Sequence, residues 1–176
     1  MILIPRWWPL MVLSPANSLI NSAPLPRDTT HLFISSGGND ALASARLLAE
    51  SVSTAWQAMG LFAEVVDRFQ NQYRAMLNDA VSRVGNVAVC TVYDAVPGYD
   101  RESLTALKLF NEIILREAFA FGLPVIDLRL ICSDEEDYSS ISSIEPSFEG
   151  GDKISNAILN LLKGHDFSVS RSVVWA

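Results

Sequence analysis

Cysteine and histidine are scarce in this chain of 176 residues, which contains two of each. Cys90 and Cys132 are too few to define a disulfide framework or a zinc site. Cys90 also lies within an apolar run, which is typical of a small core residue. No apolar run reaches the length of a membrane-spanning helix. We therefore expect a protein without a membrane span and without a metal or other cofactor.

Positive charge is also in short supply, with 13 Lys and Arg against 20 Asp and Glu and a net charge of -7. A nucleic-acid binder would need a basic face, so nucleic acid is not an expected partner. An anionic membrane surface is disfavoured for the same reason. Apolar residues make up 49% of the chain, a proportion typical of a globular domain. The oligomeric state stays open.

Residues 1–30 lack glycine and contain five prolines, which makes them a poor source of a central strand. One short strand over 10–13 is the exception. The start is apolar but interrupted by Pro5, Arg6 and Pro9, unlike the unbroken apolar region of a secretory signal. We expect a divergent N-terminal segment over 1–30 and a cytoplasmic location.

Three continuous apolar runs, at 32–35, 87–92 and 124–128, predict strands that are covered on both faces. Apolar residues at helical spacing fill the intervals between them and return over about 151–163. This alternation predicts an α/β fold, a parallel sheet between two helical layers that lacks its usual opening βα unit. We expect this domain over 31–164 and an unassigned C-terminal tail over 165–176.

Glycines follow the helical patterns at Gly60, Gly85, Gly122 and Gly164. Glycine is favoured in the left-handed position just beyond a helix, so each is expected to end a helix. Parallel strands place their C-terminal ends at one edge of the sheet, where ligands bind. The site is therefore expected in the loops that follow the strands.

The stretch Ser35-Ser36-Gly37-Gly38-Asn39-Asp40 turns from a predicted strand into a helix. Two glycines allow a tight turn, with Asn39 or Asp40 as the helix cap. Alternatively, the Asn39 amide lies over the sheet edge and donates a hydrogen bond to an oxyanion. A dinucleotide-binding fingerprint is excluded because its third glycine is missing.

A second stretch, Ile144-Glu145-Pro146-Ser147-Phe148-Glu149-Gly150-Gly151, leads into the last predicted helix. It is either a loop that ends with Ser147 as a helix cap, or the segment that brings Glu145 to the same edge as Asn39.

With "LFNEIILREAFAFGLPVIDLR" at 109–129 between them, these two stretches resemble blocks of the SGNH/GDSL hydrolase family, GDSL-like lipases and acylhydrolases. The resemblance covers roughly residues 25–163. It implies a flavodoxin-like three-layer α/β/α fold and hydrolysis of carboxylic esters without a metal. It makes Asn39 the oxyanion-hole asparagine and places Glu145 at the catalytic edge. Gly38, Asp40 and Ser147 of the same blocks are expected to bind the substrate.

The chain departs from the family where the nucleophile and the base should be. No Gly-Asp-Ser occurs, and Ser14 and Ser18 follow an apolar run without that block. The family's Asp-x-x-His corresponds here to Ser142 and Glu145. A carboxylate is a weaker base toward a hydroxyl than an imidazole. The chain is therefore expected to be an N-terminally truncated or divergent member.

The remaining candidates for a base or nucleophile are poorly placed. His31 precedes a strand and His165 follows a helix that runs back from the active edge, so both belong at the far end of the sheet. Cys132 follows a strand but has no nearby base. We thus expect an ester hydrolase by lineage that is weak or inactive in this chain. The alternatives are a non-catalytic pseudoenzyme or small-ligand binding module, an unstable truncated product, and, last, a flavin- or nucleotide-binding protein.

Overall fold

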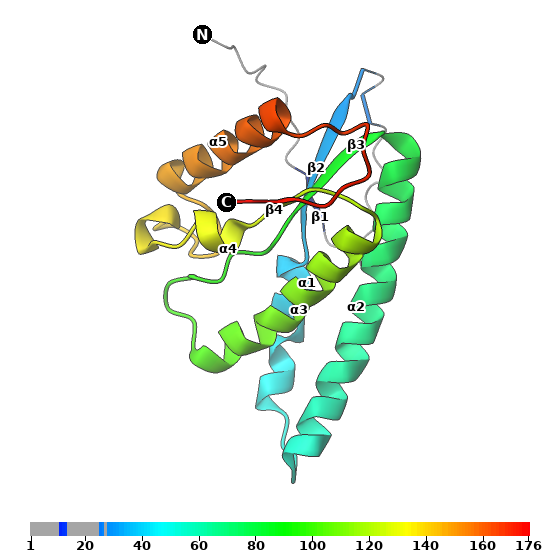
Figure 1. Cartoon of the computed structure of the whole chain (residues 1–176). Coiled ribbons are helices and arrows are strands. Elements are labelled where there is room, and N and C mark those ends of the chain that lie inside the picture. Colours follow the sequence, from blue (N-terminus) through cyan, green and yellow to red (C-terminus); the bar gives the residue numbers. More distant parts are fainter. Residues whose placement is uncertain (1–10, 14–24, 27) are drawn as a thin grey trace.

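A computed structural model of the chain describes residues 11–13, 25, 26 and 28–176 (Figure 1). Its strands form one sheet in the order β1-β2-β3-β4-β5, and every neighbouring pair is parallel. They are β1 (Met11–Leu13), β2 (His31–Ser36), β3 (Asn86–Cys90), β4 (Val125–Ile126) and β5 (Val174–Trp175). The short strand expected over 10–13 is therefore present, as β1 beside β2.

Helices cover both faces of this sheet. They are α1 (Gly38–Ser44), η3 (Ala45–Ala49), α2 (Ala55–Arg83), α3 (Arg101–Ala120), α4 (Leu128–Ile131), η4 (Glu135–Asp137) and α5 (Phe148–Gly164). Leu32 and Ile34 of β2 face the core under α2 and α3, whereas Phe33 faces the core under α5. The prediction of a three-layer α/β/α parallel sheet is confirmed (Figure 1).

The predicted strands are present, although their lengths differ from the apolar runs. β3 is buried on both faces, with Val87 and Val89 on one side and Ala88 and Cys90 on the other. β4 is only two residues long because Asp127 leaves the strand and caps α4, where its carboxylate accepts the Arg129 N–H at 3.2 Å. An apolar run alone does not reveal such a cap, so the prediction of 124–128 was too long.

The predicted helix end at Gly60 is wrong, because α2 runs without interruption over 29 residues from its Thr54 cap. Gly60 lies within this helix, and an added Cβ there would have no neighbour within 4 Å. Of the four glycines expected to be left-handed, only Gly122 is, with φ at 65°. In the part of the chain that the structure describes, no helix combines the length and apolar character of a membrane span.

The C-terminal tail belongs to the sheet. The Val125 N–H donates to the Val173 carbonyl and the Asp127 N–H to the Trp175 carbonyl, both at 2.8 Å. The connections β3-α3-β4 and β4-α5-β5 both move to the next strand in the same direction across the sheet. Helix α3 lies on one face of the sheet and α5 on the other. The β4-α5-β5 crossover therefore has the opposite handedness to the β3-α3-β4 crossover. Nothing in the tail's composition predicted this strand.

The turn between β2 and α1 depends on Gly37. Its φ is 115°, a left-handed value that disfavours any residue with a side chain. An added Cβ would lie 3.0 Å from Phe69 Cζ and 3.1 Å from Ile114 Cδ1. Gly37 is the N-cap of α1, which has no side-chain cap, so the prediction that Asn39 or Asp40 caps this helix is wrong.

Replacing Gly37 with alanine should lower the free energy of unfolding by about 1–3 kcal/mol, through backbone strain and crowding of Phe69. Urea denaturation of the purified variant measures this loss. Gly60→Ala is the matched control and should raise stability by about 0.5–1 kcal/mol, because it adds a helix former in open space. Equal stability of Gly37→Ala and wild type would contradict the assignment of strain to this turn.

Candidate active site

A cavity of about 210 Å³ lies at the C-terminal edge of β2 and β3. Its polar rim is built by three segments that are far apart in the sequence. The end of β2 and the start of α1 contribute residues 35–39, the loop after β3 contributes Tyr93, and the loop before α5 contributes residues 144–146. The edge predicted from the strand order therefore holds a cavity.

The walls of the cavity are apolar. Most come from α1, η3, α2, α3, the loop after β3 and α5: Ala41, Leu42, Ala45, Leu48, Phe62, Val92, Val96, Leu104, Leu107, Phe110, Leu128 and Ile154. Among the lining residues that the structure describes, Glu145 is the only charged one. Such a surface favours an apolar ligand with a few polar atoms at the rim.

Asn39 lies on the first turn of α1, exposed at the rim. Its side-chain amide has no hydrogen-bond partner among the described residues, so it is available to a ligand. Gly38 also lines the cavity, where an added Cβ would reach Val92 Cγ1 at 3.6 Å, an ordinary contact. The Gly37 turn thus orients α1 so that Asn39 lies over the sheet edge.

Glu145 is exposed at the same cavity, on a loop that is held at both ends. Ser139 N–H donates to the Glu145 carbonyl at 2.8 Å, and Glu145 N–H donates to the Ser142 carbonyl at 2.9 Å. The Tyr93 hydroxyl donates to the Ile144 carbonyl at 2.5 Å. Burial, reinforced by the charge of Glu145, raises the pKa of Tyr93 to about 12, so this donor keeps its proton. The structure therefore brings Asn39 and Glu145 to one cavity, as the sequence predicted.

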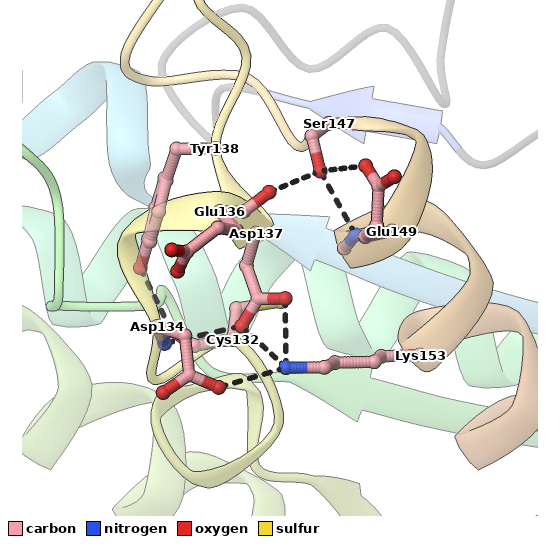
Figure 2. Close-up of polar contacts among 9 residues, drawn as sticks. Cys132, Asp134, Glu136, Asp137, Tyr138, Ser147, Glu149 and Lys153 are labelled. Carbon is pink, nitrogen blue, oxygen red and sulfur yellow. Dashed lines mark hydrogen bonds and ion pairs between the residues drawn. The ribbon is translucent and has the colours of Figure 1, made fainter.

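Two residues expected to bind substrate do not line this cavity. Ser147 caps α5, where its hydroxyl accepts the Gly150 N–H at 3.1 Å and donates to the Glu136 carbonyl at 2.6 Å (Figure 2). Asp40 is absent from the lining, and its carbonyl accepts the Ser44 hydroxyl at 2.7 Å. Of the three residues predicted to bind substrate, only Gly38 is in position.

The segment that carries Glu145 is anchored by Asp137, whose side chain is 1% exposed. Lys153 Nζ lies 2.8 Å from this carboxylate, and the Asp134 N–H donates to it at 3.1 Å (Figure 2). The Asp137 carbonyl accepts the Ser147 N–H at 2.8 Å. It also lies 2.2 Å from where a Cβ on Gly150 would be, so only glycine allows this approach. These contacts join η4 to the start of α5, and the two elements together fix both ends of the loop that carries Glu145.

Asn111 is a site residue that sequence reasoning missed. It is fully buried on α3, where its Oδ1 accepts the Val92 N–H and its Nδ2 donates to the Val92 carbonyl, both at 2.8 Å. These two bonds hold the loop after β3 that forms one cavity wall. The available signal was an asparagine among apolar residues on a buried helix face, between Leu107 and Ile114.

The imidazoles lie at the other end of the sheet. His31 is the first residue of β2, beside Asn86 at 3.2 Å, and its ring contacts Phe167 with a centroid distance of 5.0 Å. His165 contacts the same phenyl ring at 4.8 Å. Cys132 is 1% exposed, and burial raises the pKa of its thiol to about 11, which keeps it protonated.

Serine hydroxyls do line the cavity, from Ser35, Ser36, Ser44 and Ser103. No imidazole lines the cavity within the described ranges, so none of these hydroxyls has an imidazole as its base there. Ser14 and Ser18, the serines that follow the first apolar run, lie outside the described residues.

Asn111→Leu should destabilise the protein by about 1–3 kcal/mol, because the Val92 N–H and carbonyl would lose their partners in a partly buried place. Chemical denaturation measures the loss. Asn71→Leu, at an exposed position of α2, is the control and should change stability by about 0.5 kcal/mol or less. Similar stabilities for the two variants would contradict the conclusion that the Asn111 side chain holds the loop after β3.

Asp137→Asn should lower stability by about 1–3 kcal/mol at neutral pH, because a buried carboxylate loses its charge-assisted bonds. Burial alone would raise the pKa of Asp137, but hydrogen bonds from Lys153 and from the Asp134 N–H bring it below the ordinary value of 3.8. The stabilisation is therefore complete above pH 3.8 and is lost as the pH falls through the lower, folded pKa.

Denaturation at a series of pH values tests this dependence. The gap between wild type and Asp137→Asn should close only below pH 3.8. Asp134→Asn is the control, since its carboxylate binds the same lysine at 3.0 Å but is 62% exposed. This control should cost about 0.5 kcal/mol. An equal loss in both variants, or a gap that is independent of pH, would count against the Asp137 anchor.

Comparison of the chain with protein-family models, with curated proteins and with solved structures gives no match, so its function is argued from the site.

Proposed function

We propose that this protein is, by lineage, an ester hydrolase of the SGNH/GDSL type whose cavity binds a small carboxylic ester. One observation carries the proposal. Asn39 and Glu145, from segments that are far apart in the sequence, lie on the rim of the same apolar cavity. That pairing is what the resemblance of both segments to the family implies. The net charge of -7 supports a small molecule rather than nucleic acid as the partner.

In the proposed complex the acyl part of the ester packs against the apolar walls, and its carbonyl oxygen points to Asn39. The Asn39 amide donates a hydrogen bond that strengthens as negative charge develops on that oxygen. Glu145 lies across the rim, where a carboxylate can accept a proton from water or a hydroxyl. Its loop is held by Tyr93 and by the Asp137 anchor, which limits the freedom of the carboxylate.

Turnover is proposed to be weak. A carboxylate takes a proton from a hydroxyl less readily than an imidazole does near neutrality, and both imidazoles lie at the far end of the sheet. Asn39 and the cavity alone would supply part of the rate enhancement, because oxyanion stabilisation acts even without a complete triad.

The second candidate is a non-catalytic binding module on the same fold. It is favoured by the contrast between the well-fixed walls of the cavity and the imidazole base that the described lining lacks. The walls are held by Asn111 and Tyr93, whereas no imidazole lines the cavity in the described part of the chain. Such a protein would bind an ester or a similar small ligand without cleaving it.

Hydrolysis of p-nitrophenyl acetate by wild type, Asn39→Ala and Glu145→Gln separates these possibilities. A working site predicts that both variants lose roughly tenfold or more of the rate above background, since a single oxyanion donor can contribute about 10²-fold. Asn71→Ala, at an exposed place on α2, should keep the full rate. Turnover that is unaffected in both site variants would refute the proposed site. Binding of the ester without any turnover would establish the second candidate.

A further inference from the structure

The charge distribution around the cavity is one-sided. Its only charged lining residue in the described ranges is Glu145, and neither lysine, arginine nor histidine contributes to the lining there. No cation in the described lining is therefore available to pair with an anionic ligand.

Three cations directly follow lining residues in the sequence, and none of them lines the cavity: Arg46, Lys108 and Arg129. Arg46 and Lys108 are exposed. Arg129 donates to both carboxylate oxygens of Asp127, at 2.7 and 2.5 Å. The first turn of α1, beside Asn39, carries Asp40. A phosphate or carboxylate in this cavity would lose its hydration without gaining a counter-ion, which is costly. This makes a nucleotide or flavin phosphate a poor ligand.

The size of the cavity limits the apolar part of the ligand. A protein cavity of roughly 150 Å³ holds benzene, which has six carbon atoms. At the same packing, the observed volume of about 210 Å³ holds about eight non-hydrogen atoms. An acyl group of about seven carbons with its carbonyl oxygen would fill that space. Longer chains would extend into solvent.

We infer that this cavity selects uncharged esters with a compact apolar acyl group of up to about seven carbons and discriminates against esters whose acyl group ends in an anion. The inference rests on the proposed function, since it names the substrate class of that same site. Selection comes from the apolar walls and from the single carboxylate at the rim, and it does not depend on whether the bound ester is cleaved.

Titration of the full chain with simple methyl esters tests the length limit, with the amide signals of Gly37 and Gly38 in ¹⁵N–¹H spectra as the readout. From butanoate through hexanoate the affinity should rise about fourfold per methylene, the value for burying that group. Decanoate should gain little over heptanoate. An affinity that keeps rising to decanoate, or that does not change along the series, would overturn the size limit.

A matched pair of esters tests the charge selection at neutral pH. Monomethyl glutarate carries a terminal carboxylate, and methyl 4-carbamoylbutanoate replaces it with a neutral amide of the same size. The anionic ester should bind roughly tenfold or more weakly, and Glu145→Gln should narrow the difference. Equal affinity of wild type for the two esters would overturn the inference.

Leu107 and Leu109 provide matched variants on α3. Leu107 lines the cavity, whereas Leu109 does not line it and is 38% exposed. Leu107→Trp should fill the space and shift the length limit to shorter acyl groups, and Leu109→Trp should leave the series unchanged. If Leu107→Trp does not fold, the wild-type titrations with the methyl ester series and with the two glutarate derivatives still test the size limit and the charge selection.

Turnover of p-nitrophenyl acetate, measured alongside, separates this inference from the proposed function. Selective binding without turnover would refute the hydrolase and leave the selectivity intact. Turnover without discrimination between the glutarate derivatives would refute the selectivity and leave the hydrolase intact.

Discussion

Burial of β2 and β3 on both faces is the constraint from which the rest of the site follows. Helices α2 and α3 cover one face and α5 the other, so these two strands cannot slide without exposing apolar side chains. Their parallel register pairs His31 with Asn86 and Ser35 with Cys90. Both strands therefore end at the same level, and the loops that follow them open side by side. Residues of both loops line the cavity.

Polar groups hold the walls of this cavity, while the walls themselves stay apolar. Asn111 satisfies the Val92 backbone, Tyr93 binds the Ile144 carbonyl, and Asp137 joins η4 to the start of α5 (Figure 2). Each of these groups makes its hydrogen bonds within the protein, and of the three only Tyr93 lines the cavity. Asn39 differs, because its amide has no partner among the described residues. This division separates the residues that build the site from the residue that is available for chemistry.

Prediction from the sequence succeeded where a local pattern has one dominant physical cause. Ser147 follows a loop and precedes a helical pattern, and it does cap α5. It failed where distant contacts decide the outcome. Gly60 is a separate case, since it was expected to end a helix but lies within the continuous helix α2. Asn111 was not distinguished from its apolar neighbours because its partner, Val92, lies on another element.

The sequence by itself determined the order of strands and helices, the two-sided burial of the sheet and the edge at which Asn39 lies, because these follow from apolar periodicity and from the parallel βαβ rule. Only the tertiary structure decided that Ser147 and Asp40 do not line the cavity and that the tail adds β5. The physical reason is that hydrogen bonds and side-chain contacts between distant segments set these positions, and no local pattern encodes the distance between two loops.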